Sequence, residues 1–238
     1  MSGIVLVTGA AKRVGLHVAL RLLEDGFDVV AHYRSPAPGV ETLRKAGATV
    51  VQADLGDVAE LRHLVMRVRS VTRSLRAVVH NASAFSKTSG DLDEDVALFE
   101  RFFRVHMLAP YVLNRELLGL LRASEVKPAD IVHLTDIYAE RPNPDFATYC
   151  ATKAGLVNLT RALAKRYAPD VKVNAIAPGP ILFREEHSEE SRRAVLSKTP
   201  LGVEGGPEAI YLALKALLDN HYITGAVIPV DGGRSLTE

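Results

Sequence analysis

The stretch IVLVTGAAKRVG, residues 4–15, passes from a short apolar run through two glycines into a second apolar segment. The β-branched run Ile4–Thr8 predicts a strand, and the apolar spacing of Val14–Glu24 predicts a helix. Glycine lets the backbone bend tightly and approach a phosphate, whose charge is favoured at a helix N-terminus. The stretch therefore predicts a strand, a tight turn and a helix that together form a candidate pyrophosphate site.

The alternation of short apolar runs and longer helical patterns continues along the whole chain. Strands are predicted over Ile4–Thr8, Asp28–Tyr33, Thr49–Asp54, Ala77–Asn81, Asp130–Thr135, Val171–Ala177 and Ala226–Val230. Helices are predicted over Val14–Glu24, Val40–Ala46, Asp57–Thr72, Val96–Ala123, Thr148–Ala168 and Pro207–Asn220. Strands that are apolar almost throughout are typical of a parallel sheet covered on both faces. We therefore expect one α/β domain over residues 1–238, a Rossmann-like doubly wound sheet of about seven parallel strands with helices on both faces.

Composition and charge argue against several classes of protein. Hydrophobic residues make up 47% and charged residues 24%, as in an ordinary globular chain. The formal charge of +1 argues against a nucleic-acid partner held by bulk charge. Cys150 is the single cysteine, which excludes an internal disulfide framework and fits a reducing compartment. Because the apolar run Ile4–Val7 is too short for a signal peptide or a membrane span, we expect a cytoplasmic protein without a membrane partner. No pattern of metal ligands is present in the sequence.

Three long connections follow the fourth, fifth and sixth predicted strands: Ala82–Asp91, Asp136–Phe146 and Pro178–Ser191. Ligands of open α/β sheets bind beyond the carboxyl ends of the strands, where these connections begin. The connections are either tolerated surface insertions or the walls of a pocket. Three of them at one edge favour a pocket.

The type of cofactor is indicated at two turns. In the first turn Gly9, Val14 and Gly15 are candidate phosphate ligands, and Arg13 stands where the dinucleotide fingerprint usually has its middle glycine. Arg13 is either a solvated surface charge or a guanidinium beside a phosphate. An NAD-binding protein would place Asp or Glu at the end of the second strand, but this chain has Arg34 and Ser35, which suit a 2′-phosphate. We therefore expect NADPH.

Other strand ends complete the predicted cofactor site. Asp54 and Leu55 would flank an adenine ring, although Asp54 could instead cap the next helix together with Asp57. Small residues at the end of the fourth strand permit close approach of a ligand, and the end of the sixth strand would meet the nicotinamide half. The candidates at these two ends are Asn81, Ala82, Ser83, Pro178 and Gly179.

Tyr149 and Lys153 form the strongest local signal for chemistry. Residues four apart on a helix share a face, so the phenol and the ammonium group should lie together. A nearby cation stabilises a phenolate and should lower the pKa of Tyr149 by about one to three units. The pair is a candidate acid that works at neutral pH.

The order and spacing of these residues resemble the short-chain dehydrogenase/reductases over essentially the whole chain. The matching positions are the turn Thr8–Gly15, Asn81-Ala82-Ser83, Tyr149 with Lys153, Asn174 before Pro178-Gly179, and the closing Asp231-Gly232-Gly233. Three positions depart from the family pattern: Asp136 replaces its usual serine, His106 its usual asparagine, and Arg13 the middle glycine of the turn. Asp136, Arg13 and an aromatic residue at Phe85 resemble the pteridine reductases within that family.

This resemblance implies NADPH-dependent reduction of a dihydropteridine such as 7,8-dihydromonapterin, with hydride to C6 and a proton to N5, and weak activity on dihydrofolate. Tyr149 and Asp136 would be the acid pair, and Lys153 would orient the nicotinamide ribose and tune Tyr149. Arg13 and Ser83 would line the junction of cofactor and substrate, and Ile181 would contact the cofactor. The family also implies a homo-oligomer, commonly a tetramer.

Several alternatives stay open. Phe85 either stacks on a flat ligand or packs beneath its own loop, and His106 either maintains a proton path toward Lys153 or is a structural histidine. A reductase of carbonyl or quinone substrates is one rival function, but an ionised Asp136 would repel the negative charge that develops on a carbonyl oxygen. A non-catalytic NADPH-sensing protein is another, although a sensor would have no need of both Tyr149 and Lys153.

Overall fold

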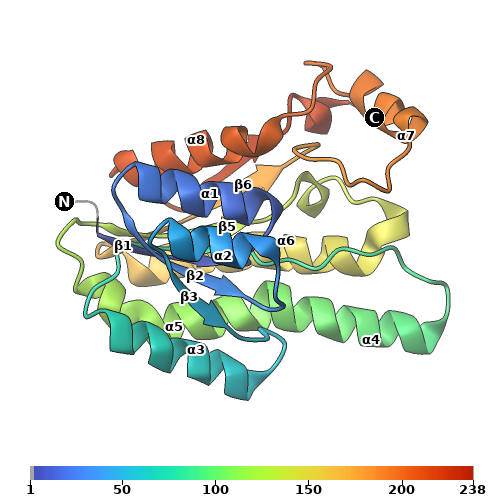
Figure 1. Ribbon diagram of the computed structural model, residues 1–238. Helices are drawn as coiled ribbons and strands as arrows, with labels where there is room; N and C mark the ends of the chain where they lie inside the picture. The colour runs from blue at the N-terminus through green and yellow to red at the C-terminus, as the bar shows by residue number, and fades with distance from the viewer. Residues whose placement is uncertain (1–2, 238) are drawn as a thin grey trace.

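The computed structural model describes residues 3–237, which fold into one seven-stranded parallel sheet between two layers of helices (Figure 1). Its strands are β1 (Ile4–Thr8), β2 (Asp28–Tyr33), β3 (Thr49–Gln52), β4 (Ala77–His80), β5 (Ala129–Leu134), β6 (Val171–Pro178) and β7 (Val227–Val230). The strand order β3-β2-β1-β4-β5-β6-β7 places β1 between β2 and β4, where the direction of winding reverses. The predicted fold class is confirmed, and the reversal marks the carboxyl end of β1 as the expected ligand site.

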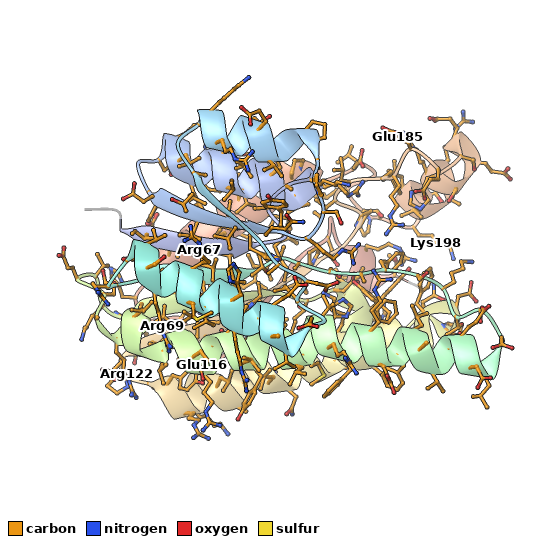
Figure 2. All side chains as sticks on the ribbon, turned by 60° about the horizontal axis from the view of Figure 1, so that its bottom comes forward. Arg67, Arg69, Glu116, Arg122, Glu185 and Lys198 are labelled. Atoms are coloured by element: carbon orange, nitrogen blue, oxygen red, sulfur yellow. The ribbon has the colours of Figure 1, made fainter. Side chains whose placement is uncertain are left out.

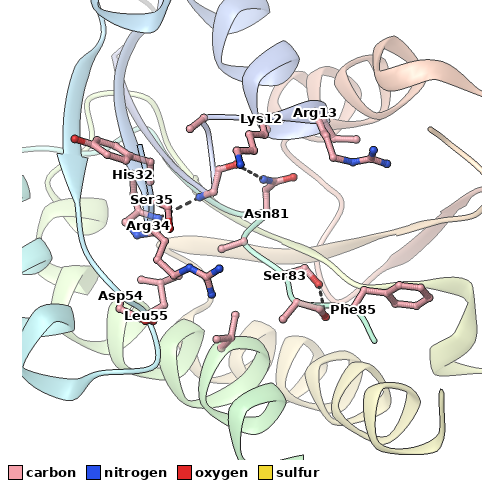
Figure 3. A pocket seen from close by; sticks show the side chains of 18 of the residues that line it. Lys12, Arg13, His32, Arg34, Ser35, Asp54, Leu55, Asn81, Ser83 and Phe85 are labelled. Carbon is pink, nitrogen blue, oxygen red and sulfur yellow. Dashed lines mark hydrogen bonds between the residues drawn. The ribbon is translucent and has the colours of Figure 1, made fainter. Parts of the chain in front are cut away.

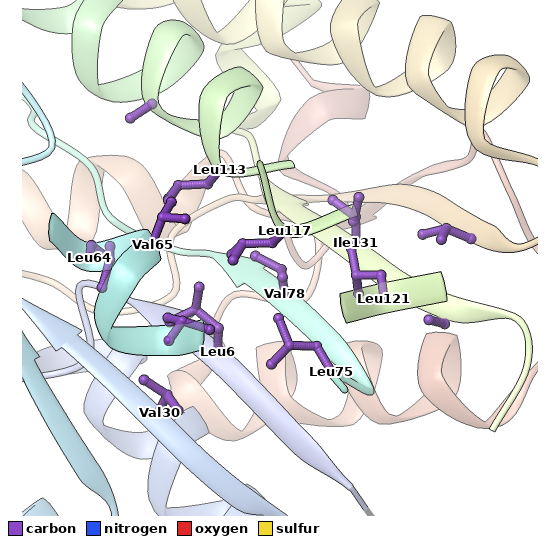
Figure 4. Packing of buried hydrophobic residues seen from close by; sticks show 14 of the residues in the cluster. Leu6, Val30, Leu64, Val65, Leu75, Val78, Leu113, Leu117, Leu121 and Ile131 are labelled. Carbon is purple, nitrogen blue, oxygen red and sulfur yellow. The ribbon is translucent and has the colours of Figure 1, made fainter. Parts of the chain in front are cut away.

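Each face of the sheet is covered by its own set of helices. Helices α1 (Arg13–Glu24), α2 (Pro38–Lys45) and α8 (Gly206–Asp219) lie on one face, and α3 (Val58–Val71), α5 (Ala109–Arg122) and α6 (Ala147–Tyr167) lie on the other (Figure 1). Alternate side chains of β1 enter opposite clusters, because successive residues of a strand point to opposite faces. Leu6 packs with α3 and α5, as Figure 4 shows, whereas Val5 and Val7 pack with α1 and α8. At the surface, Arg69 of α3 and Glu116 of α5 form an ion pair 3.1 Å long (Figure 2).

Two helical regions differ from the prediction. The helix expected over Val96–Ala123 begins earlier, as α4 (Leu92–Phe103), because the Asp91 carboxylate accepts a hydrogen bond from the Glu94 N–H at 3.0 Å. A π-helical turn over Arg104–Leu108 then separates α4 from α5. Helix α7 (Glu189–Ser197) was not predicted, because it has no buried residue and therefore no apolar stripe to reveal it.

A buried charge cluster lies at the amino ends of the central strands. Asp130 of β5 is fully buried and contacts Arg76 and Lys172, whose Nζ lies 3.1 Å from the carboxylate. Arg76 also donates to the carbonyl of Leu218 at 2.7 Å, and Lys172 donates to that of Leu217 at 2.8 Å. The two cations thus satisfy carbonyls at the C-terminus of α8 and join that helix to the sheet.

A chain of buried hydrogen bonds links β4 and β5 to the helices α5 and α6. His80 of β4 and His133 of β5 are paired residues of adjacent strands, and Asn114 of α5 bonds to both, at 2.6 and 3.0 Å. The Thr160 hydroxyl donates to the carbonyl of Leu156, so it accepts the proton of His133 Nδ1 at 2.8 Å. Along this chain of hydrogen bonds each N–H group then has one acceptor, and the imidazoles of His80 and His133 are both neutral.

We expect acid to destabilise the fold through these rings. Burial lowers the pKa of His80 to about 4 from an ordinary 6.5, and it lowers the pKa of His133 well below its usual value. As the pH falls, the unfolded chain therefore takes up protons first. The stability from His80 is complete above about pH 6.5 and falls by about 3 kcal/mol toward pH 4. Urea unfolding at several pH values measures this loss. His80→Gln, whose amide nitrogen keeps the donor to Asn114, should reduce the slope, and an unchanged slope would contradict the role of His80.

Candidate active site

A cavity of about 820 Å³ opens at the carboxyl ends of β1, β2, β3 and β4 (Figure 3). It brings together the residues that the sequence predicted for the phosphates, the adenosine and the substrate mouth. They are Gly9, Arg13, Val14, Gly15, Arg34, Ser35, Asp54, Leu55, Asn81, Ala82, Ser83 and Phe85. The cavity therefore lies at the reversal of strand order, where the fold predicts a ligand site.

The turn after β1 requires glycine for steric reasons. Gly9 has a φ of +67°, and a Cβ there would lie 2.8 Å from the Cα of Ala82. A Cβ on Gly15 would lie 2.3 Å from the carbonyl oxygen of Gly9. The Asn81 amide donates to the carbonyls of Thr8 and Gly9, at 3.0 Å each, and so ties β4 to the turn. Only a chain without side chains at these two positions can pass so close to β4.

Arg13 adopts the left-handed conformation that its position usually reserves for glycine. Its φ is +53°, the only positive value among the non-glycine residues that the structure describes. Left-handed backbone costs an L-residue about 1–2 kcal/mol. The Arg13 guanidinium donates to the carbonyl of Leu182 at 2.5 Å, so it links the first turn to the segment after β6. The Arg13 side chain is exposed and lines the cavity, where this contact with Leu182 holds it.

The ends of β2 and β3 form the adenosine side of the cavity. Arg34 is exposed to the cavity, and its carbonyl accepts a hydrogen bond from the Gln52 side chain at 3.0 Å. Asp57 caps α3, accepting from the N–H groups of Ala59 and Glu60. Asp54 instead accepts from the Gly56 N–H at 2.8 Å. The helix-capping alternative for Asp54 is therefore wrong, and its side chain lies in the wall of the cavity.

Tyr149, Asp136 and Lys153 form a compact group beneath the cavity, although none of them lines it. The Tyr149 hydroxyl donates to the Asp136 carboxylate at 2.8 Å, and that carboxylate also accepts from the Tyr138 N–H at 2.9 Å. Lys153 Nζ donates to the carbonyl of Leu134 at 2.9 Å and lies 5.6 Å from the centre of the Tyr149 ring. The phenol is thus bonded to an acid and has a cation on one side of its ring.

The predicted effect of Lys153 on Tyr149 is wrong in this structure. Burial and the Asp136 carboxylate together raise the pKa of Tyr149 well above its usual value. Burial also raises the pKa of Asp136 and lowers that of Lys153 to about 8. Burial disfavours the phenolate, and the phenol is hydrogen-bonded to an acid, whereas the ammonium group of Lys153 donates to the carbonyl of Leu134. Tyr149 and Asp136 therefore behave as a proton-sharing pair, in which the phenol keeps its proton at neutral pH.

His106 is held by hydrogen bonds on both nitrogens. Its Nε2 accepts from the Ala84 N–H at 3.1 Å and lies 3.1 Å from the Ser83 hydroxyl. Its Nδ1 lies 2.9 Å from the hydroxyl of Thr152, which itself donates to the carbonyl of Tyr149. Burial lowers the pKa of His106 to about 2, so the ring is neutral. These contacts favour the structural interpretation, because both ring nitrogens hold neighbouring segments and neither contacts Lys153.

Phe85 meets other aromatic rings on one side and the cavity on the other. It stacks on Phe146 with 4.5 Å between ring centres, and its ring meets Tyr149 nearly at a right angle, 4.8 Å away. The Arg184 guanidinium lies 5.3 Å from the Phe85 ring centre. Phe85 is half-buried and lines the cavity. Its ring therefore packs with its neighbours and also offers surface to a ligand.

Besides Tyr149 and Lys153, three further predicted cofactor residues lie outside the lining of the cavity: Pro178, Gly179 and Ile181. The Gly179 N–H donates to the carbonyl of Val230 at 3.0 Å, and a Cβ on Gly179 would lie 2.6 Å from the Cβ of Asp231. Ile181 is buried in the apolar cluster beneath α8. In this structure these residues serve the packing of β6 against β7 and of the segment that follows β6.

The sequence prediction missed several residues of the cavity wall. They are Ala11, Lys12, His32, Tyr33, Ala84, Val105, Arg184, Glu185 and Glu186. His32 had a detectable signal, because a histidine inside an apolar strand must find partners for both ring nitrogens. Arg184, Glu185 and Glu186 gave none, since they belong to a long connection whose path depends on the packing around it.

Across residues 3–237, none of the helices is both long and apolar enough to span a membrane. The same residues contain no group of three or more His, Cys, Asp or Glu side chains arranged to bind a metal ion.

The chain is similar to known proteins over nearly its full length. A family model described as enoyl-(acyl carrier protein) reductase matches residues 9–235. Dihydromonapterin reductase of Enterobacter sp. (strain 638) is 41% identical over 234 residues, which cover 98% of this chain and 96% of that protein. The enzyme of the same name from Klebsiella pneumoniae is 38% identical over 232 residues, with the same two coverages. The crystal structure of FolM alternative dihydrofolate reductase 1 from Brucella canis, complexed with NADP, has a TM-score of 0.90 at 34% identity and covers 99% of this chain and 94% of that chain.

Proposed function

The chain belongs to the short-chain dehydrogenase/reductase family, and from this premise we propose that it is an NADPH-dependent reductase converting 7,8-dihydromonapterin to the tetrahydro form. The observation that carries the proposal is the hydrogen bond of 2.8 Å between Tyr149 and Asp136 beside the ring of Phe85. An acid pair next to an aromatic face suits a flat ring whose nitrogen must be protonated. Relatives named dihydromonapterin reductase support the same substrate.

The cavity fits a phosphorylated dinucleotide. Gly9 and Gly15 leave the backbone of the turn open to a pyrophosphate, and the first N–H groups of α1 have no partners within the helix. Arg34 and Ser35, which follow β2, would hold a 2′-phosphate. When bound, NADPH supplies the hydride that is added to C6 of the substrate.

Replacing Arg34 with glutamate is expected to weaken NADPH binding far more than NADH binding. A charge-assisted hydrogen bond is worth about 1.5–3 kcal/mol, or about ten- to 150-fold in affinity. Titration of both cofactors by fluorescence measures the two dissociation constants. Arg44→Glu, which makes the same charge change on α2 outside the cavity wall, is the control. Equal affinity of the wild type for NADPH and NADH would contradict the assignment.

The proton required at N5 of the pterin would come from the Tyr149–Asp136 pair. The Tyr149 hydroxyl, which donates to Asp136 in the structure, would turn to donate its proton to N5, and a protonated Asp136 would then donate its own proton to the phenol oxygen. Burial raises the pKa of Asp136, which favours that protonated form. Lys153, held by the carbonyl of Leu134, stabilises the negative charge that passes through the phenol oxygen. One hydride and one proton together saturate the C6=N5 bond.

Phe85→Ala is expected to raise the Michaelis constant for dihydropterins about two- to tenfold, because an aromatic pair is worth about 0.5–1.5 kcal/mol. The wall of the cavity includes Phe85 but not its stacking partner Phe146. Phe146→Ala is therefore a matched control that breaks the same stack from outside the cavity. We expect both variants to lose similar stability and only Phe85→Ala to change the pterin Michaelis constant. An equal change of the pterin Michaelis constant in Phe85→Ala and Phe146→Ala would mean that Phe85 acts only by packing.

The substrate is tested by NADPH oxidation with dihydromonapterin, dihydrobiopterin and dihydrofolate in parallel, and with a ketone and a quinone as controls. We expect dihydromonapterin to have the highest kcat/KM and dihydrofolate to react weakly. Faster turnover of the ketone or the quinone would favour the carbonyl-reductase alternative. Tight NADPH binding without turnover of any compound would favour a cofactor sensor.

We also propose a homo-oligomer, commonly a tetramer in this family, in the cytoplasm. Exposed large apolar side chains on α4 and at the start of α5 support self-association. They are Leu92, Phe99, Phe103 and Tyr111. The free thiol of Cys150 fits a reducing compartment. Light scattering after gel filtration tests the assembly, and a monomer at micromolar concentration would contradict it.

A further inference from the structure

We propose that His32 is a positioning residue of the dinucleotide site, whose neutral imidazole fixes the phosphate turn after β1 to the end of β3. The inference rests on the proposed cofactor and adds a residue that acts on it through the surrounding backbone. His32 belongs to β2 and lies at the cavity edge near Arg34 and Ser35 (Figure 3). Its side chain is nevertheless almost completely buried.

The two ring nitrogens of His32 bind two different backbone segments. Nδ1 lies 3.1 Å from the amide nitrogen of Gly9, and Nε2 lies 2.9 Å from the carbonyl oxygen of Ala53. An amide N–H only donates and a carbonyl oxygen only accepts. The proton must therefore sit on Nε2, and the lone pair of Nδ1 must face Gly9. The contacts thus fix both the orientation and the tautomer of the ring.

These two contacts join all three segments on the adenosine side of the cavity. Gly9 belongs to the turn after β1, and Ala53 follows β3. Arg34 lies two residues after His32, just beyond the end of β2. A second backbone bond strengthens the first junction, since the Ala10 N–H donates to the carbonyl of His32 at 2.8 Å. One side chain therefore sets the spacing between the phosphate turn, the 2′-phosphate segment and the adenine wall.

The peptide of Gly9 is held on both sides. Its N–H donates to His32, and its carbonyl accepts from the Asn81 amide at 3.0 Å. Because the Gly9 N–H points into the protein, the first N–H groups of α1 are those that face the ligand. A turn fixed in this way binds phosphate without first paying the entropy of ordering its backbone. Loss of the His32 contact should therefore weaken cofactor binding more than it weakens catalysis.

Histidine also suits the position electrostatically. A protonated ring would direct an N–H of its own at the Gly9 N–H and would break the contact. Burial lowers the pKa of His32 below its usual value, so the ring stays neutral and keeps the acceptor that Gly9 needs.

Two amide variants test the role, because each reproduces one end of the imidazole. Asparagine places its carbonyl oxygen near the position of Nδ1, so His32→Asn keeps the acceptor for Gly9 and loses the donor to Ala53. Glutamine places its amide nitrogen near Nε2, so His32→Gln keeps the donor to Ala53 and loses the acceptor. We expect His32→Gln to weaken NADP⁺ binding about tenfold and His32→Asn less than about threefold. For both variants, kcat at saturating NADPH should stay within about twofold of wild type.

The measurements are calorimetric titration with NADP⁺, thermal unfolding without ligand, and steady-state kinetics. Equal NADP⁺ affinities in the two variants, or affinities that simply follow their melting temperatures, would overturn the role of His32. A wild-type protein that does not bind NADP⁺ would overturn the proposed function instead. Should neither variant fold, nitrogen NMR of wild-type protein labelled at histidine decides. The proposal requires a neutral His32 protonated on Nε2, and a ring protonated on Nδ1 overturns it.

Discussion

Tyr149→Phe is expected to lower turnover about 10²- to 10⁴-fold, the range that a positioned general acid contributes. The variant keeps the ring, which packs against Phe85 and Phe102, and removes only the hydroxyl that donates to Asp136. NADP⁺ affinity and melting temperature should therefore change little. Single-turnover kinetics at saturating NADPH and dihydromonapterin measure the chemical step directly.

Tyr138→Phe is the matched control for this experiment. Tyr138 lies in the same aromatic cluster, and its hydroxyl contacts Asn143 at 3.4 Å rather than Asp136. It should turn over within about threefold of the wild type, the effect of one weak neutral hydrogen bond. Wild-type turnover in Tyr149→Phe would mean that Asp136 or water protonates N5 without the phenol. An equal loss in the two variants would indicate general damage to the cluster.

Asp130→Asn is expected to destabilise the fold by about 3–5 kcal/mol, because it leaves two buried cations without their counter-charge. Arg76 and Lys172 cannot move to water, since each side chain is at most 5% exposed and is bonded to carbonyls of α8. For a chain of this size the loss corresponds to a melting temperature lower by about 6–20 °C. Urea unfolding gives the free energy, and the slope shows whether unfolding stays two-state.

The exposed pair Arg122–Asp170 provides the comparison. Its atoms are also 3.1 Å apart, but the two side chains are 52% and 39% exposed. Asp170→Asn should cost no more than about 1 kcal/mol, because water screens such a pair. If Asp130→Asn were as mild, the buried carboxyl would already be neutral in the folded protein. Burial raises the pKa of Asp130, whereas Arg76 and Lys172 lower it. The measurement therefore tests whether the buried carboxyl is charged in the folded protein.

The fold was largely predictable because its signals are local. Continuous apolar runs gave all seven strands to within a few residues, and the glycine turn placed the reversal of strand order at β1. Helix α7 was not predictable in this way, because its sequence has no buried face. The π-helical turn before α5 was also missed, since it depends on how His106 reaches Ser83 and Thr152 across the structure.

The sequence predicted part of the lining of the cavity, and it predicted less of how those residues contact one another. Spacing alone placed Tyr149 beside Lys153, but it could not tell which neighbour the phenol would bond. The phenol is hydrogen-bonded to Asp136, thirteen residues earlier in the sequence and on a separate connection. Burial and this carboxylate together raise the pKa of Tyr149, against the expected direction. His32 was missed for the same reason, since its partners Gly9 and Ala53 lie on two other strands' ends.

The left-handed backbone of Arg13 is a steric cost that accompanies a side chain at the wall of the cavity. Glycine would adopt the same φ of +53° without a steric penalty, so Arg13→Gly would remove the backbone strain at this position. That substitution would also remove the side chain that connects the first turn to Leu182. Directed evolution for heat resistance alone would tend to discard Arg13, and stabilising the protein for practical use should therefore keep this position fixed while other sites vary.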